Sequence, residues 1–119
     1  MFKISKFSNI DEILKDIENR YKTNEKTRKK LAKFNEPIEL TFLDTNHKVT
    51  ILINGDQDIE IKDNAANEEA PVKIEFISEQ VLIDIFNKNL GAVKAYSSGK
   101  IKIIEGKIRN LLKLKSLLF

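Results

Sequence analysis

The 119-residue chain contains no cysteine and a single histidine, His47. The lack of cysteine excludes disulfides, thiolate metal sites and cysteine nucleophiles. With one histidine and no thiol, the sequence also offers no conventional nucleophile–base pair. His47 follows Asn46 in an expected hairpin turn, where we expect an exposed, solvated imidazole rather than a catalytic one. We therefore expect a protein that is not an enzyme.

Long hydrophobic runs are absent as well. The first residues, Met1 to Lys6, lack the apolar core of a signal peptide. No run approaches the roughly 20 apolar residues of a membrane-spanning helix. The carboxylates show no spacing typical of a cation site, so we expect no metal and no cofactor. These absences favour the cytoplasm.

The net charge of +3 is unevenly distributed. Residues 20–33 hold seven basic side chains and one acid, Glu25, whereas residues 54–79 are mostly acidic. From Asn87 onward Glu105 is the only acid. Such runs usually form solvated faces, and the alternative for the basic run is attraction to nucleic acid or anionic lipid. The exposed strand faces lack the aromatic residues on which RNA-binding sheets stack bases, so we expect no nucleic-acid partner.

Two amphipathic helices are predicted at the start of the chain. The first has an apolar stripe at helical spacing, formed by Ile10, Ile13, Leu14, Ile17 and Tyr21. Ser8 or Asn9 can cap its beginning, and Asn24 can cap a basic helix that continues to about Lys33. Both helices should lie on a core.

Residues 38–76 contain four runs in which apolar and polar side chains alternate. The apolar members are Ile38, Leu40 and Phe42; Val49, Ile51 and Ile53; Ile59 and Ile61; and Val72, Ile74 and Phe76. Alternation indicates strands with one buried and one solvated face. Segments 44–47 and 54–57 have turn composition, so the pattern predicts an antiparallel meander.

Helices and one further strand are expected after the meander. Ser78 can cap a helix with a wide apolar arc, a short helix is expected within residues 90–98, and residues 100–104 alternate again. Gly106 precedes the last helix. The fold class is therefore α+β: a five-stranded, largely antiparallel sheet with helices packed on one face, in a single domain spanning residues 1–119.

The terminal helix is apolar over nearly half its circumference. Its arc contains Ile108, Leu111, Leu112, Leu114, Leu118 and Phe119. Lys115 falls inside this arc and can snorkel, while Leu117 falls outside it and should be exposed. A buried leucine contributes about 1.5–3 kcal/mol, so this face must cover something apolar. The simplest interpretation is packing on the protein's own core.

One C-terminal stretch resembles a known family. The residues concerned are Lys94-Ala95-Tyr96, Gly99-Lys100-Ile101-Lys102-Ile103 and Gly106, followed by the leucine-rich helix. Together with the element order, they resemble the sterol carrier protein-2 (SCP2) domain family, of the non-specific lipid-transfer protein type. The resemblance implies a sheet roofed by helices, with a hydrophobic cavity between the layers. It also implies binding of fatty acids, acyl-CoA, sterols or other lipids without covalent chemistry.

The resemblance implies a lipid site made of apolar residues from both layers. The candidate lipid-binding residues are Phe42, Leu82, Phe86, Leu90, Val93, Tyr96, Ile108, Leu111, Leu112 and Phe119. Each of them suits a filled core equally well. The alternative function is an interaction module with a filled core that docks a partner enzyme or a second copy through its C-terminal helix. A third hypothesis is transient contact with an anionic membrane surface through the basic helix.

Overall fold

The computed structural model describes residues 7–119. The helices are α1 (Ile10–Thr23), α2 (Glu25–Lys30), α3 (Glu79–Phe86), α4 (Ala92–Ser97) and α5 (Ile108–Leu118). The strands are β1 (Pro37–Phe42), β2 (His47–Asn54), β3 (Asp58–Asp63), β4 (Val72–Phe76) and β5 (Ile101–Glu105). All ten elements overlap the segments that the periodicities predict, although α2 ends at Lys30 rather than near Lys33. The α+β class is confirmed.

The five strands form one mixed sheet in the order β3-β2-β1-β4-β5. The β1–β2, β2–β3 and β4–β5 pairs are antiparallel, as the largely antiparallel prediction requires. The meander ends after three strands, however. The chain then crosses the sheet and places β4 parallel to β1, with Leu40 opposite Ile74 and Phe42 opposite Phe76.

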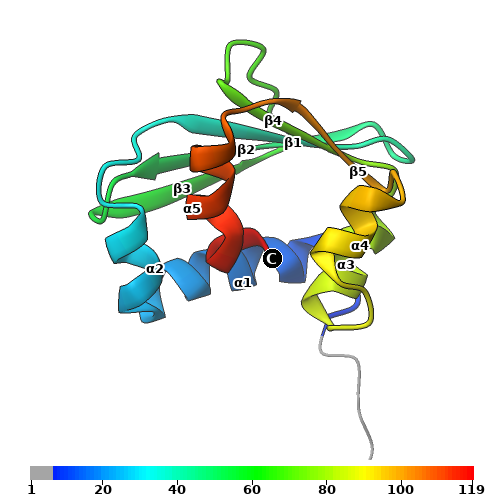
Figure 1. Cartoon of the computed structure of the whole chain (residues 1–119), viewed down its shortest axis with the longest axis horizontal. Helices are drawn as coiled ribbons and strands as arrows, with labels where there is room; N and C mark the ends of the chain where they lie inside the picture. Colours follow the sequence, from blue (N-terminus) through cyan, green and yellow to red (C-terminus); the bar gives the residue numbers. More distant parts are fainter. Residues whose placement is uncertain (1–6) are drawn as a thin grey trace, which may run out of the picture.

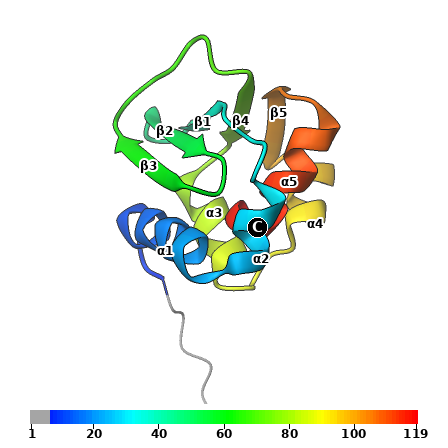
Figure 2. The same ribbon diagram turned by 90° about the vertical axis from the view of Figure 1, so that its left-hand side faces the viewer.

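The helices cover one face of this sheet and enclose the core (Figures 1 and 2). The sheet side of the core is formed by residues such as Leu40, Val49 and Ile74, each at most 1% exposed. The rings of Phe42 and Phe76 stack there with their centroids 5.2 Å apart. Ile13 and Ile17 of α1 are fully buried in the same core. The predicted stripe of α1 is thus the face that packs.

The opposite face of the sheet is only partly solvated, which corrects the expectation of one wet face. The loop between β3 and β4 rises over it (Figure 1). The backbone N–H of Asn67 donates to Glu39 Oε2 at 2.6 Å, and Thr50 Oγ1 donates to the Ala65 carbonyl at 2.8 Å. Glu39 and Thr50 are therefore buried polar residues. They are tolerated there because both are hydrogen-bonded.

The N-termini of the helices are stabilised in two ways. Asn9 and Asn24 accept hydrogen bonds from backbone N–H groups in the first turns of α1 and α2, as predicted. Ser78 makes no such side-chain bond at α3. Instead Asp44 Oδ1 accepts from the Glu79 N–H at 3.2 Å. The acceptor for α3 therefore comes from the β1–β2 turn.

Tyr21 ties α1 to the β2–β3 turn. Its hydroxyl donates to the Gly55 carbonyl at 2.6 Å, and the residue is 2% exposed. Gly55 has a φ of +55°, and an added Cβ would lie 2.7 Å from the Ala32 carbonyl oxygen. Only glycine fits this close approach. The turn is held between α1 and the chain segment after α2.

We expect Tyr21→Phe to lower the free energy of unfolding by about 1–3 kcal/mol, because it leaves a buried carbonyl without its donor. Burial, followed by the charges of Asp56 and Asp58, raises the pKa of Tyr21. The folded state therefore favours the neutral phenol. The contribution of the Tyr21 hydroxyl to the free energy of unfolding should be fully present below about pH 10. It should be lost as the pH rises through the folded-state pKa of Tyr21. Denaturant titrations of the wild type and the variant across this pH range should show that their difference in free energy of unfolding becomes smaller. A difference that stays constant would contradict the stabilising role of the neutral Tyr21 hydroxyl.

Candidate functional site: an apolar groove between α4 and α5

An open groove of about 650 Å³ lies at the β5 edge of the molecule. We call it the α4–α5 groove. It is lined by Ala92, Val93, Tyr96, Ser97, Ile101, Ile103, Gly106, Leu111, Leu112, Lys115 and Phe119. Figure 1 shows α4 and α5 beneath the two ends of β5. The groove thus lies between one edge of the sheet and two helices.

The rim of the groove exposes large apolar side chains. Val93 is 78% exposed, Leu112 64% and Tyr96 54%. Isolated exposed apolar residues are common on proteins, but a contiguous apolar patch marks a binding surface. These three line the same hollow as Ile101 and Ile103 of β5. The arrangement suits an apolar ligand rather than water.

Helix α5 has two apolar sides, and this corrects the helical-wheel prediction. Leu114, Leu117 and Leu118 are fully buried against the core, although Leu117 was expected to be exposed. Leu112 and Lys115 line the groove instead. A hydrogen bond from α2 also holds α5 in place, because Thr27 Oγ1 donates to Ser116 Oγ at 3.1 Å.

Helix α4 is short and packs against the core through one buried residue. Ala95 is fully buried, while Val93 and Tyr96 are exposed on the groove side. The Ala95 carbonyl accepts from the Lys100 N–H at 2.8 Å, and Gly99, with a φ of +81°, turns the chain directly into β5. The position of the rim residues therefore follows from this tight helix-to-strand turn.

Gly106 turns the chain from β5 into α5 at the edge of the groove. Its φ of +147° lies in a region that residues with a Cβ rarely adopt. Space is not the constraint, since an added Cβ would meet Val72, Ile103 and Leu111 only at ordinary contact distances of 3.6–3.8 Å. Backbone conformation explains the glycine here.

The groove is built from a strongly cationic part of the chain. Residues 87–119 contain eight lysines and arginines and one glutamate. Lys115 is the charged side chain among the lining residues. In the part of the chain that the structure describes, none of these eight cations is paired with a carboxylate. An anionic group would be attracted to this end of the molecule.

The comparisons with known proteins identify the family of this chain. The model of the SCP-2 sterol transfer family matches residues 14–119. The chain belongs to this family. The comparison with curated proteins gave no match.

Solved structures share the fold of this SCP-2 family chain. Palmitated SCP2L2 from Aedes aegypti is 15% identical with a TM-score of 0.69, covering 93% of this chain and 95% of that one. Sterol carrier protein domain 2 of Helicoverpa armigera is 20% identical with a TM-score of 0.66, covering 91% and 83%. The inverting sec-alkylsulfatase Pisa1 from Pseudomonas sp. is 18% identical with a TM-score of 0.62. That match covers 76% of this chain but only 14% of the sulfatase, so the chain corresponds to a small part of that enzyme's length.

The structure divides the ten predicted lipid-binding residues of this SCP-2 domain into two groups. Five of them line the α4–α5 groove: Val93, Tyr96, Leu111, Leu112 and Phe119. Four others lie outside it: Phe42, Leu82 and Phe86 are buried in the core, and Leu90 is partly buried against it. The side chain of Ile108 lies outside the described residues. The assignment to lipid stays a prediction for all ten.

Phe86 shows why a core position gives no ligand surface in this conformation. Its ring meets Phe7 edge-to-face at 5.9 Å and carries the Arg20 guanidinium 4.0 Å from its centroid. Arg20 is held in turn by Asp16 at 2.9 Å. Protein atoms thus already occupy the neighbourhood of this ring.

Sequence reasoning missed several groove residues, namely Ala92, Ser97, Ile101, Ile103, Gly106 and Lys115. Two signals were available. Ile101 and Ile103 share one face of an alternating strand, and Lys115 interrupts an apolar arc. Neither signal indicates a groove until the facing helices are placed.

His47 is not a solvated turn residue, contrary to the expectation. It begins β2, and its side chain is only 15% exposed. Its Nε2 lies 2.5 Å from Asp63 Oδ1, and its Nδ1 lies 3.5 Å from Glu79 Oε2. The imidazole therefore links β2, β3 and α3, away from the groove.

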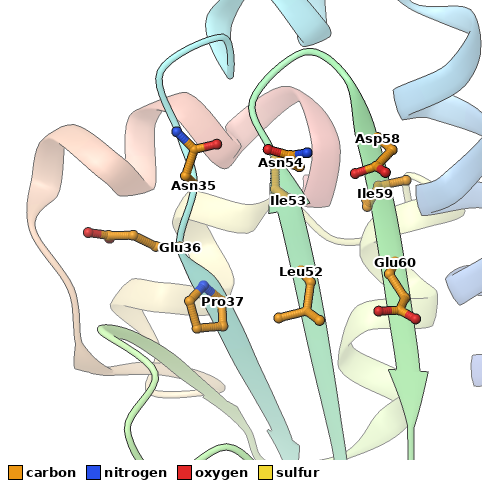
Figure 3. A pocket seen from close by; sticks show the side chains of 9 residues that line it. All are labelled: Asn35, Glu36, Pro37, Leu52, Ile53, Asn54, Asp58, Ile59 and Glu60. Atoms are coloured by element: carbon orange, nitrogen blue, oxygen red, sulfur yellow. The ribbon is translucent and has the colours of Figure 1, made fainter.

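A second hollow, of about 560 Å³, lies across the ends of β1, β2 and β3 and has a polar lining. Figure 3 shows its side chains standing side by side on neighbouring segments. Glu36 and Glu60 lie at opposite sides of the row and do not point toward one another (Figure 3). Within residues 7–119 no cluster of three ligating side chains could hold a metal ion. Nor do any of the helices in this range have the length and apolar character needed to cross a bilayer.

Proposed function

We propose that this SCP-2 family protein is a non-enzymatic lipid carrier that holds a fatty acyl chain in the α4–α5 groove. The observation that carries the proposal is an apolar hollow of about 650 Å³ whose rim exposes Val93, Tyr96 and Leu112. This volume falls within the range of about 300–1,000 Å³ typical of small-molecule sites. The palmitated state of the Aedes aegypti relative supports an acyl ligand. We keep the cytoplasm as the predicted compartment.

Apolar burial supplies the binding free energy in this proposal. Each methylene removed from water contributes about 0.8 kcal/mol. Ten methylenes would therefore contribute about 8 kcal/mol, which exceeds the lower estimates of the cost of association. Lys115 lies in the lining, where its ammonium would meet a carboxylate or phosphate at the end of the acyl chain. The favoured ligands are fatty acids and acyl-CoA.

Native mass spectrometry of protein purified without detergent tests the proposal. We expect a bound mass equal to a fatty acid or an acyl-CoA. A chain-length series of fatty acids, competed against a fluorescent fatty acid, should show affinity rising up to about fourfold per methylene until the groove is filled. A ligand-free mass together with no uptake of the fluorescent fatty acid would contradict the proposal.

The second candidate is a protein-interaction module that docks a partner enzyme or a second copy through α5. The exposed Leu112 favours it, as does the likeness of this chain to a small part of a much longer sulfatase. Light scattering on the lipid-free protein separates the two candidates. A dimer that Leu112→Glu converts to a monomer would favour the second, whereas a monomer that takes up fatty acid favours the first.

A further inference from the structure

The charges of this domain are segregated. Residues 87–119 carry eight basic side chains and one acid, so the remaining residues, 1–86, are net negative even though they include the basic helix α2. Lys94 and Lys107 are both exposed and directly follow groove-lining residues, Val93 and Gly106. Two exposed cations are therefore each one residue away in sequence from the groove lining, in addition to Lys115 within it.

The opening of the groove bears the exposed apolar residues Val93, Tyr96 and Leu112. Apolar and aromatic side chains flanked by lysines are the combination that binds a membrane interface. The apolar parts enter the boundary between headgroups and acyl chains, and the ammonium groups remain with the phosphates. A tyrosine suits this boundary because its ring is apolar and its hydroxyl is polar.

We propose that the opening of the α4–α5 groove docks on an anionic lipid bilayer, with Val93, Tyr96 and Leu112 inserted and Lys94 and Lys107 over the headgroups. The proposal rests on the proposed function in that the docked opening is the entrance of the lipid site. Docking there would let an acyl chain pass between bilayer and groove without crossing water. The cost of exposing an apolar chain to water would then be avoided.

The basic helix α2 is the other candidate for binding the bilayer, but two of its cations already have partners within the protein. Lys29 pairs with Glu25 at 3.5 Å, and Arg28 Nη1 donates to the Tyr21 carbonyl at 2.9 Å. In the described part of the chain, the large exposed apolar residues are Leu43, Ile77, Val93, Tyr96, Ile104 and Leu112, none of which lies on α2. The surface of α2 therefore has positive charge but no large exposed apolar residue that could insert into a bilayer.

Vesicle co-sedimentation tests the assignment with two charge-matched double variants. Lys94→Glu/Lys107→Glu removes the cations beside the groove, and Lys26→Glu/Lys30→Glu makes the same change on α2. We expect the wild-type protein to bind phosphatidylcholine vesicles containing phosphatidylserine and to lose binding at high salt. The first variant should bind at least about tenfold more weakly, since each basic residue near an anionic surface contributes roughly a fivefold factor. The second variant should bind within about threefold of the wild type.

Insertion can be followed with a single tryptophan, because the chain has none. Val93→Trp should show a blue-shifted emission with anionic vesicles, and brominated lipids should quench it. Leu43→Trp is the control, since Leu43 is also exposed, at 49%, but lies outside the groove. Equal quenching of both variants would overturn the proposed orientation.

Uptake of an uncharged fluorescent long-chain alcohol from solution separates the two proposals. If the wild-type protein takes up the alcohol but does not bind anionic vesicles, docking through the groove is wrong and the carrier function stands. The same conclusion follows if uptake persists and only the α2 double variant loses vesicle binding. Vesicle binding without uptake would support docking and contradict the carrier function. Circular dichroism and thermal unfolding would establish that each variant is folded.

Discussion

Leu112→Glu should weaken the binding of a fluorescent fatty acid by at least about tenfold, equivalent to about 1.4 kcal/mol. Leu112 lines the groove and is 64% exposed. A carboxylate at this position would be buried by an acyl chain without a partner, and such burial is strongly unfavourable. It would also repel the head of a fatty acid. The folded state should be almost unaffected, because the new charge lies in water until ligand binds.

Leu43→Glu is the matched control for this experiment. Leu43 is 49% exposed and follows β1, away from the groove lining. The substitution has the same chemistry and the same change in net charge. Uptake by the Leu43 variant should equal that of the wild type. If the Leu112 variant also took up the fatty acid normally, the α4–α5 groove would not be the lipid site.

The fold class could be predicted because periodicity is local. Alternation in residues 38–54 identifies two strands, and the turn composition of residues 44–47 identifies their antiparallel pairing. The partner of β4 could not be predicted in this way. It follows a loop of eight residues, and alternation states which face is buried but not which strand is adjacent. The parallel β1–β4 pair is therefore a property of the tertiary structure.

The groove could be predicted only in part for a related reason. An apolar residue such as Phe42 or Val93 contributes the same hydrophobicity to the pattern whether it meets side chains, a ligand or a membrane. Phe42 is fully buried and Val93 is 78% exposed. Only the position of α4 at the end of the sheet distinguishes them. The resemblance to a family indicated a lipid site, whereas the placement of the elements selects which residues can reach a ligand.

Helix α5 is the clearest case, and it yields a stability prediction. Leu117→Ala should lower the free energy of unfolding by about 2–5 kcal/mol, because Leu117 is fully buried and its truncation leaves a cavity. Leu112→Ala, on the same helix, should change it by no more than about 0.5 kcal/mol, because Leu112 is exposed. Urea unfolding of the two variants and the wild type measures the difference directly.

This pair of variants decides how α5 is rotated about its own axis. The sequence pattern alone places Leu112 inside the apolar arc and Leu117 outside it, which predicts the opposite order of effects. If Leu112→Ala proved the more destabilising, α5 would turn Leu112 into the core and the groove would lose that wall. The expected order keeps Leu112 and Lys115 available to a ligand while Leu114, Leu117 and Leu118 hold the helix in place. Removing the last turns of α5 would therefore expose the core, so point substitutions rather than a truncation are the way to test its role in binding.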